Sequence, residues 1–593
     1  MLTKPRAGHG AKLRQALGVA TAVATMFAVF AAPLPAAADT PATDNDHIPF
    51  SSSFAGNFLA ARFAGKHKHI RRAAAYYLEA LRSDPGNAHL LDRAFSLSLA
   101  DGQIKTAIEL AKEIDTKTTS TPIARLALAS NEARNKSYDA AIARTGTPSS
   151  GPLEKLTTGI LAAWSKQGLG DTDGALKFLD ELKGPEWFGV FKAYHAGLIA
   201  SQANQFDTAT TLLTSAYKTD NGAMRTAIAL AIAQAHSGQM EAAVKTLSEY
   251  TERRTSHPML ERVLADLRAG KKPDLLISSP QAGVAEILYG LGLAIGQDGG
   301  GEISAIYLQL ALHLDPASDL TRFALADLFE RSKDYHRAIS VLGSIKETSS
   351  LYRNAVIQIG LNYNALDKVD EARAKIGALV DADPSDLRAV RALGNMLRGH
   401  KLFAEAAAAY SKGIATIKDP KRPHWTFFYY RGICNERTDK WTEAEADFKK
   451  ALELFPDQPH VLNYLGYSWV DKGLHLDEAL AMIRKAVEQQ PRDGYIVDSL
   501  GWVYYRLGRL EEAVRELERA VQLRPQDSVI NDHLGDAYWR VGRKLEAKFQ
   551  WSHARDLDPE PEELIKIKEK IASGLSEDAT NAASITADKE PEK

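Results

Sequence analysis

The chain has 593 residues, of which 45% are hydrophobic and 25% charged, with 73 basic against 75 acidic side chains. A net charge of −2 gives no reason to expect nucleic acid or an anionic membrane as the main partner. The single cysteine, Cys434, excludes an internal disulfide and a CxxC metal or redox site.

The first 38 residues have the pattern of a secretory signal peptide. A basic segment precedes the apolar run LGVATAVATMFAVF at 17–30, and three alanines ending at Ala38 offer a cleavage site before Asp39. A retained membrane anchor is the alternative, but the apolar run is shorter than the roughly 20 residues that a spanning helix needs. We expect cleavage near Ala38, a linker at 39–47, and a periplasmic chain without a membrane span, with peripheral association with the envelope.

A period of 34 residues begins after this linker. One alanine recurs at this interval six times, each time within an amphipathic helical pattern: Ala73, Ala107, Ala141, Ala175, Ala209 and Ala243. This regularity predicts helical hairpins in an array, because a single hairpin cannot bury its apolar faces alone. We expect six degenerate hairpins over 48–254, and a partial repeat with a linker over 255–283, where the period breaks.

The period returns over 284–560, where it predicts eight further hairpins. A small residue marks the first helix of each: Gly292, Ala326, Gly360, Gly394, Gly432, Gly466, Gly501 and Gly535. In one unit, Leu500, Gly501 and Tyr504 form an apolar stripe, Gly508 marks the turn and Pro525 follows the second helix. Residues 561–575 are expected to form a capping helix, and the polar residues 576–593 a disordered tail.

Three motifs invite a chemical interpretation, and each has a simpler one. The glycines of GLGLAIGQDGGG at 290–301 follow no strand and precede no Gly-Lys-Ser/Thr, which favours a turn over a phosphate loop. His67 and His69 lie among basic residues that disfavour a cation, and Cys434 has the position of a small packing residue. No paired carboxylates or Ser/His/Asp set stand out, so we expect no catalysis, cofactor or metal.

The spacing of Leu500, Gly501, Tyr504 and the alanines that follow resembles the tetratricopeptide repeat (TPR) over about 48–560. The resemblance implies an all-α fold, a right-handed α-solenoid of about 14 hairpins in two blocks, with a concave groove. The groove positions of this family's first helices imply a set of candidate partner-binding residues: Arg388, Arg391, Asn395, Arg398, Tyr429, Asn463, Tyr467, Tyr495, Trp502, Tyr505, Asp532 and Trp539.

Arg391 and Asn395 resemble one half of the TPR carboxylate clamp, but Asn463 and Tyr467 stand where further basic groups would complete it. An extended segment lying along the groove is therefore expected instead of a gripped terminal carboxylate. Aromatic and arginine side chains supply much of the energy at protein interfaces, which favours a protein or peptide as the partner.

The C-terminal repeats also resemble exported bacterial envelope TPR scaffolds and adaptors. Some members of that group bring substrates to a periplasmic carboxyl-terminal processing protease, although they are commonly lipoproteins and this chain has no lipidation cysteine. The resemblance implies a non-enzymatic scaffold. The alternatives are a component of an envelope assembly or polysaccharide-export machine, and an enzyme of glycan chemistry, for which the continuous repeats leave no room.

Overall fold

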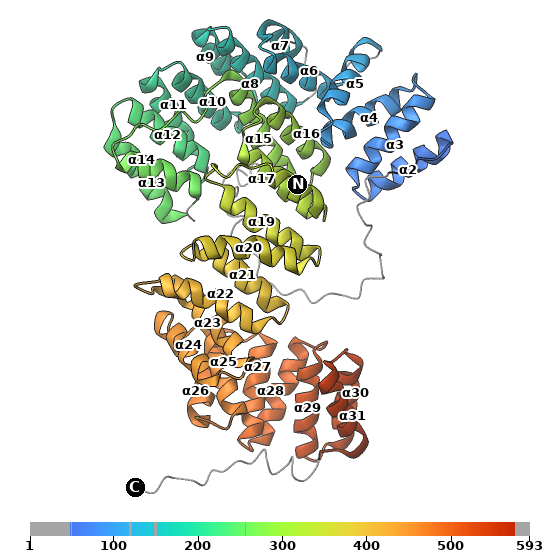
Figure 1. Cartoon of the computed structure of the whole chain (residues 1–593), viewed down its shortest axis with the longest axis vertical. Coiled ribbons are helices and arrows are strands. Elements are labelled where there is room, and N and C mark those ends of the chain that lie inside the picture. Colours follow the sequence, from blue (N-terminus) through green and yellow to red (C-terminus); the bar gives the residue numbers. More distant parts are fainter. Residues whose placement is uncertain (1–47, 49, 118–120, 147–150, 255–256, 576–593) are drawn as a thin grey trace, which may run out of the picture. The chain divides into compact units, whose positions relative to one another are not determined.

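The computed structural model describes residues 48, 50–117, 121–146, 151–254 and 257–575 (Figure 1). These ranges contain helices and connecting segments and no strand, which confirms the all-α solenoid of helical hairpins in two blocks. The expected signal peptide at 1–38, the linker at 39–47 and the tail at 576–593 lie outside the described residues. The chain divides into two compact units, Met1–Ala372 and Arg373–Lys593.

The repeat formed by α27 (Gly494–Arg506) and α28 (Leu510–Leu523) shows why the sequence folds as hairpins. Asp493 caps α27 by accepting hydrogen bonds from the first backbone N–H groups of the helix. A methyl group on Gly501 would come within 2.6 Å of Leu517, so glycine permits the two helices to approach. Gly508 has a φ of +75° in the turn, a conformation that other residues adopt at a cost.

The first unit begins with six hairpins, each made of a first and a second helix, and a single helix follows them. The first helices are α2 (Phe54–Lys66), α4 (Ala88–Ala100), α6 (Pro122–Arg134), α8 (Pro152–Gly168), α10 (Phe188–Gln202) and α12 (Met224–His236), followed by α14 (Pro258–Arg268). The second helices are α3 (Ile70–Ser83), α5 (Ile104–Lys117), α7 (Tyr138–Thr145), α9 (Thr172–Glu181), α11 (Phe206–Thr219) and α13 (Met240–Arg253).

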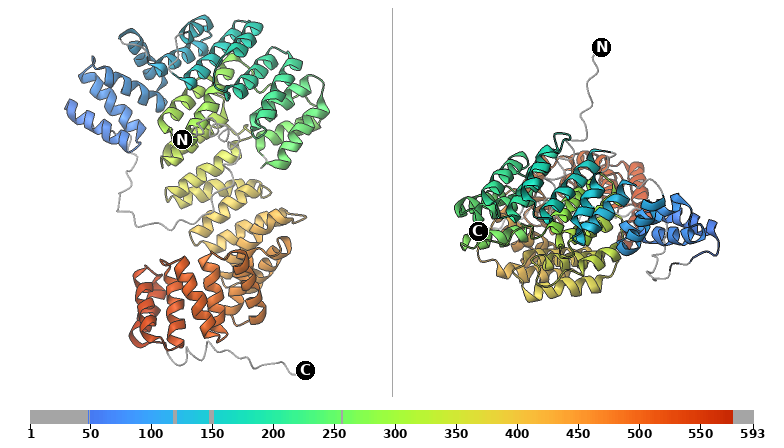
Figure 2. Two further views of the ribbon diagram at one scale, coloured as in Figure 1. Left: turned by 180° about the vertical axis from the view of Figure 1, so that it is seen from behind. Right: turned by 90° about the horizontal axis from the view of Figure 1, so that it is seen from above.

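The next hairpin, α15 (Pro280–Gln297) and α16 (Gly301–Leu314), packs inside the arc of these helices (Figures 1 and 2). Helix α15 contacts α6, α8 and α10, and α16 contacts α4 and α6, all of them first helices. These contacts place the hairpin against the first-helix side of the first block. The inner face of the first block is therefore covered by a later part of the same chain.

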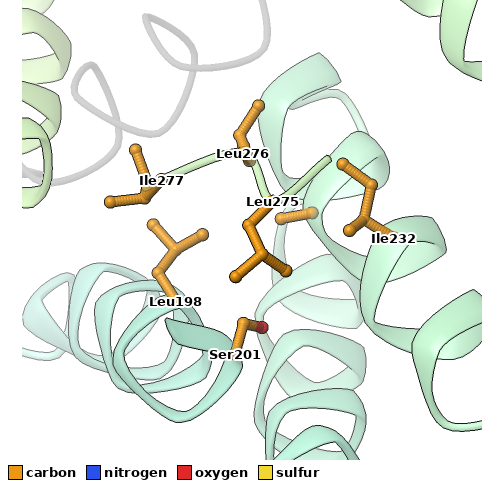
Figure 3. Close-up of a pocket in the computed structure, with 7 residues that line it drawn as sticks. Leu198, Ser201, Ile232, Leu275, Leu276 and Ile277 are labelled. Carbon is orange, nitrogen blue, oxygen red and sulfur yellow. The ribbon is translucent and has the colours of Figure 1, made fainter. Parts of the chain in front are cut away.

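The segment that leads into this hairpin also lies on first helices. Leu275, Leu276 and Ile277 line a small pocket together with Leu198 of α10 and Ile232 of α12 (Figure 3). Next to them, a ring nitrogen of His236 lies 2.8 Å from the carbonyl oxygen of Pro273. The break in the 34-residue period is thus a packed return segment, whose apolar side chains join the core of the first unit.

A buried polar cluster fixes α15 against the first block. The Arg225 guanidinium donates to both Glu286 carboxylate oxygens, at 2.5 and 2.6 Å, and the Tyr194 hydroxyl donates to one of them at 2.7 Å. Nearby, the Trp164 indole donates to His195 at 3.0 Å, and both side chains are buried. A charge in such a place is tolerated only with a close partner. These contacts therefore specify where the hairpin docks.

The first unit continues with α17 (Asp319–Arg331), α18 (Tyr335–Leu342) and α19 (Tyr352–Ala365), and α20 (Val369–Ala382) contains the boundary between the units. The second unit contains one 3-10 turn, η1 (Arg422–His424), and a regular series of hairpins. Its remaining helices are α21 (Leu387–Gly399), α22 (Phe403–Thr416), α23 (Trp425–Glu436), α24 (Trp441–Leu454), α25 (Pro459–Asp471), α26 (Leu476–Gln489), α27, α28, α29 (Ser528–Arg540), α30 (Lys544–Asp556) and α31 (Pro561–Ser573).

Candidate partner-binding face of the second unit

The first helices of the second unit, α21, α23, α25, α27 and α29, follow one another side by side. Helix α21 contacts α23, and α27 contacts both α25 and α29. Between α23 and α25, the rings of Tyr429 and Tyr464 meet edge to face with centroids 6.1 Å apart. We call the surface formed by these five helices the first-helix face. All twelve candidate residues from the sequence lie on these helices.

Arginines occupy the α21 end of the first-helix face. Arg388 and Arg391 are exposed, and Arg391 lies over the ring of Phe427 at 5.3 Å. Arg398 is half-buried over the Tyr430 ring at 4.6 Å. Asn395 accepts a hydrogen bond from the Tyr410 hydroxyl at 2.8 Å. Two of the guanidinium groups thus lie over aromatic rings, an arrangement that orients them while their charge stays available.

The aromatic candidates differ in how much of each ring reaches the surface. Tyr495 is 49% exposed, with the Arg524 guanidinium 4.4 Å from its ring centroid. Tyr429, Tyr467, Trp502 and Trp539 are half-buried, and Tyr505 is buried. Trp502 stacks between Tyr505 at 4.8 Å and His533 at 4.1 Å. Much of this aromatic surface therefore joins neighbouring first helices to one another, and Tyr495 presents the largest exposed ring.

A charged cluster lies beside these rings, and of its members only Asp532 was a candidate from the sequence. Lys570 of α31 donates to Asp532 at 2.7 Å and to Asp536 at 2.8 Å, while the Trp551 indole donates to Asp536 at 2.9 Å. Asp532 and Asp536 are four residues apart and so share one face of α29. Lys570 follows Asp536 by one 34-residue period, and this spacing could have indicated that α31 continues the array.

Helix α31 also reaches the far end of the second unit. The Lys401 ammonium, in the turn after α21, lies 2.8 Å from a carboxylate oxygen of Glu560, immediately before α31. Both side chains are exposed, and such pairs contribute little to stability. The contact nevertheless places the start of α31 close to the arginine end of the first-helix face.

The chemical motifs considered in the sequence have structural roles. Gly299, with a φ of +90°, lies in the turn between α15 and α16. Cys434 is buried, and burial raises the pKa of its thiol to about 11, so the reactive thiolate is disfavoured at neutral pH. Across the described residues, no group of three or more His, Cys, Asp or Glu side chains is arranged to hold a metal ion. In the same residues, no helix is long and apolar enough to cross a membrane.

The two units are expected to respond oppositely to mild acid. Burial lowers the pKa of His195 in the first unit from 6.5 to about 4. Between these two values His195 is protonated in the unfolded chain but neutral in the folded unit. The first unit should lose on the order of 2 kcal/mol of stability on going from pH 7.5 to pH 5. Burial alone would lower the pKa of His533 in the second unit, but Asp498, 3.0 Å away, raises it above 6.5.

The stabilisation from the His533 pair is fully present below pH 6.5 and is lost as the pH rises through the folded pKa. Hydrogen exchange measured at the two pH values, after correction for intrinsic rates, should show less protection in α8 and α10 at pH 5. Helices α27 and α29 should keep or increase their protection. A parallel loss in both units would contradict this assignment.

Family models match four stretches of the chain. A model described as TPR repeat matches residues 501–542, and models described as Tetratricopeptide repeat match 200–267, 358–423 and 414–459. These stretches lie in both units and coincide with hairpins of the structure. The chain is a tetratricopeptide repeat protein. TPR proteins bind other proteins.

Two curated relatives match about a third of this TPR protein. It is 26% identical over 195 residues to TPR repeat-containing protein PA4667 of Pseudomonas aeruginosa, and the match covers 32% of each chain. It is 28% identical over 188 residues to BBSome complex member BBS4 of Bos taurus, covering 32% of this chain and 35% of that protein. The chain therefore spans only about a third of the length of each relative.

Solved structures of low sequence identity also align with this TPR protein. The APC/C hetero-tetramer Cut9-Hcn1 aligns with a TM-score of 0.36 and 15% identity, covering 88% of this chain and 97% of that chain. A crystal structure of MamA aligns with a TM-score of 0.25 and 21% identity, covering 28% of this chain and 94% of that chain.

Proposed function

We propose that this TPR protein is a non-enzymatic scaffold that holds an extended segment of a partner protein on the first-helix face of the second unit. The observation that carries the proposal is that Arg388 and Arg391 of α21 and Tyr495 of α27 are exposed on first helices. In the first unit, the corresponding inner face packs against α15 and α16. The second unit is therefore the better candidate for a partner that lies along first helices.

The partner segment should be extended and carry acidic groups. Arginines at the α21 end match carboxylates geometrically, since a guanidinium can donate two parallel hydrogen bonds. The half-buried rings of Tyr429, Tyr467 and Trp502 supply flat apolar surface between the arginines and α29. Asn463 is also half-buried, and its side-chain oxygen has no hydrogen-bond partner among the described residues. A partner's backbone N–H group could satisfy it after a small rearrangement.

The proposed place of action is the periplasm, after cleavage near Ala38. The signal-peptide pattern of residues 1–38 supports this location. Within the envelope, the scaffold would bring substrates to a carboxyl-terminal processing protease. The second candidate function is a component of an envelope assembly or polysaccharide-export machine. Affinity capture from envelope extracts separates the two, because one recovers a protease with its substrate and the other an export complex.

A charge-reversal variant tests the proposed face. Replacing Arg391 with Glu and Tyr495 with Ala removes one cation and one exposed ring, and should weaken capture of the main partner by about 30-fold or more, as for an interface hot spot of about 2 kcal/mol. Quantitative mass spectrometry of captured proteins measures the change. The matched control replaces Arg515 with Glu and Phe549 with Ala, which removes an exposed cation and an exposed ring from second helices α28 and α30.

The control variant should capture the partner as well as the unmodified protein does. Equal capture by the unmodified protein and the Arg391/Tyr495 variant would exclude these residues from the interface. Equal loss in both variants would indicate a general effect on the fold. Circular dichroism distinguishes that outcome, because both substitutions replace exposed side chains and should leave the helical signal unchanged.

A further inference from the structure

Helix α2 carries an uncovered surface that differs from the rest of the molecule. Leu59 is 64% exposed and Phe63 is 66% exposed, one helical turn apart. Arg62 and Lys66, also exposed, lie on the same side of the helix. The surface faces away from α3, which packs on the buried Asn57, Ala61 and Ala64. We call these four exposed side chains the α2 patch.

The stretch of sequence around the α2 patch carries charge of a single sign. Residues 48–78 contain five lysines and arginines and no aspartate or glutamate, in a chain whose net charge is −2. The basic residues continue through the turn after α2, where the ring of His67 lies 4.1 Å from that of Phe63. Apolar rings and cations are thus interleaved on one continuous surface.

A second exposed apolar pair, on α30, lacks the uniformly signed charge that accompanies the pair on α2. Leu545 and Phe549 on α30 are 83% and 69% exposed and also lie one turn apart. Their helix, however, carries acidic residues among its basic ones, and Glu546 lies between the two apolar positions. Exposed apolar side chains alone therefore do not distinguish the α2 patch. The distinguishing feature is their combination with basic side chains on a helix that has no acidic residue.

We propose that the α2 patch binds the surface of an anionic bilayer. A helix that lies in a membrane interface inserts aromatic and aliphatic side chains below the headgroups, while lysine and arginine contact the lipid phosphates. The α2 patch has both elements on one side of one helix. A convex helix surface with separate apolar side chains suits a fluid interface better than it suits a rigid protein groove. The chain would lie on the membrane without crossing it.

This proposal does not depend on the first-helix face of the second unit. Its test is co-sedimentation with vesicles, using the chain that begins at Asp39 so that the apolar run at 17–30 makes no contribution. The chain should sediment with vesicles of equal parts phosphatidylglycerol and phosphatidylcholine, and remain in solution with phosphatidylcholine alone. Added salt should weaken binding, because the attraction of the cations is screened.

Two double variants separate the apolar and ionic contributions. Leu59→Ser with Phe63→Ser should weaken binding by at least about tenfold, since burying each side chain is worth about 1.5–3 kcal/mol. Arg62→Glu with Lys66→Glu should weaken it by at least about 25-fold, since each basic group near an anionic surface contributes roughly fivefold. All four side chains are exposed, so thermal unfolding should be nearly unchanged. The matched control, Leu545→Ser with Phe549→Ser, should bind like the unmodified chain.

Failure to sediment with phosphatidylglycerol vesicles would overturn the proposal. So would binding that the Leu59/Phe63 variant retains, or that the Leu545/Phe549 variant loses equally. Retention on immobilised polyglutamate without vesicle binding would assign the α2 patch to an acidic protein. Loss of a dimer in the Leu59/Phe63 variant, measured by analytical ultracentrifugation and again without vesicle binding, would assign it to a second copy of the chain. Either result replaces the membrane as the partner.

Discussion

Replacing Glu286 with Gln is expected to destabilise the first unit by about 3–5 kcal/mol, because it leaves the charge of Arg225 buried without a counter-charge. The side chain of Arg225 is 18% exposed and that of Glu286 8%, and the two are joined by a pair of short hydrogen bonds. The amide of Gln fills the same space as the carboxylate, so the loss of stability measures the effect of the charge and not of the packing. Hydrogen exchange should show lower protection throughout α8, α10, α12 and α15.

The same carboxylate makes the first unit sensitive to strong acid. Burial alone would raise the pKa of Glu286, but the charge and hydrogen bonds of Arg225 and the hydroxyl of Tyr194 lower it below 4.5. A lowered pKa contributes stability that is present above pH 4.5 and is lost as the pH falls through the folded pKa. The Gln variant has no group to titrate there, so its deficit should shrink in that range.

Glu302→Gln is the matched control for this prediction. Glu302 belongs to α16 and pairs with Arg93 of α4 at 2.9 Å, so it also joins the hairpin to the first block. Its pair is about one-third exposed, and exposed pairs contribute at most about 1 kcal/mol. If the two variants lose equal stability, burial of the Arg225 pair is not what fixes the hairpin.

Replacing Lys570 with Gln is expected to release α31 from the second unit at neutral pH. The ammonium group separates Asp532 from Asp536, and all three side chains are less than one-fifth exposed. Without it, two carboxylates repel each other in a poorly solvated place, which should cost about 3 kcal/mol or more. Limited proteolysis should then cut near residue 560, and the protection of α31 from hydrogen exchange should fall.

Mild acid should restore the docked helix in this variant. Burial, with the charge of Asp532, raises the pKa of Asp536 to about 6 against the opposing effect of Lys570. Since the folded pKa exceeds the ordinary 3.8, the folded state gains stability as the pH falls below about 6. Removal of Lys570 should enlarge this effect. Lys401→Gln, which breaks the exposed pair with Glu560, is the control and should leave α31 protected. A Lys570 variant with the same deficit at pH 7.5 and pH 5 would contradict the assignment.

The 34-residue period predicted the helical hairpins because each residue that recurs in it is required by a contact or a backbone conformation within one hairpin. Gly501 is small where Leu517 approaches, and Gly508 takes a left-handed conformation in the turn. Both requirements arise within one hairpin, so the sequence of that hairpin is enough to predict its fold. The twelve candidate residues were likewise placed on first helices, since the helical register follows directly from the period.

The exposure of those residues was not predictable in the same way. Tyr495 and Tyr505 are both groove positions in the repeat, yet one is half exposed and the other is buried. Trp502 of the same helix stacks on the ring of Tyr505, and Arg540 of the next first helix lies over that ring, whereas Arg524 lies over the ring of Tyr495. The position of a residue in the repeat predicts the side of the helix on which it lies. It does not predict how neighbouring side chains and helices cover that residue.

The 34-residue period also could not predict that α15 and α16 dock inside the first block. Arg225 and Glu286 are 61 residues apart, and each looks like an ordinary helical surface charge. Whether a hairpin continues an array or folds back on it depends on the path of the preceding segment. Leu275, Leu276 and Ile277 determine that path through contacts with α10 and α12, which appear only in three dimensions.

The hairpin inside the first block has a consequence for biosynthesis. Helix α14 ends at residue 268, but α16 ends only at Leu314. The ribosome therefore adds 46 more residues before α15 and α16 can pack against the first six hairpins. At about 5–20 residues per second this interval lasts about 2–10 s, and in it α15 and α16 do not yet cover α4, α6 and α8. The first block can therefore reach its final packing only after the part of the chain that forms α15 and α16 has been made.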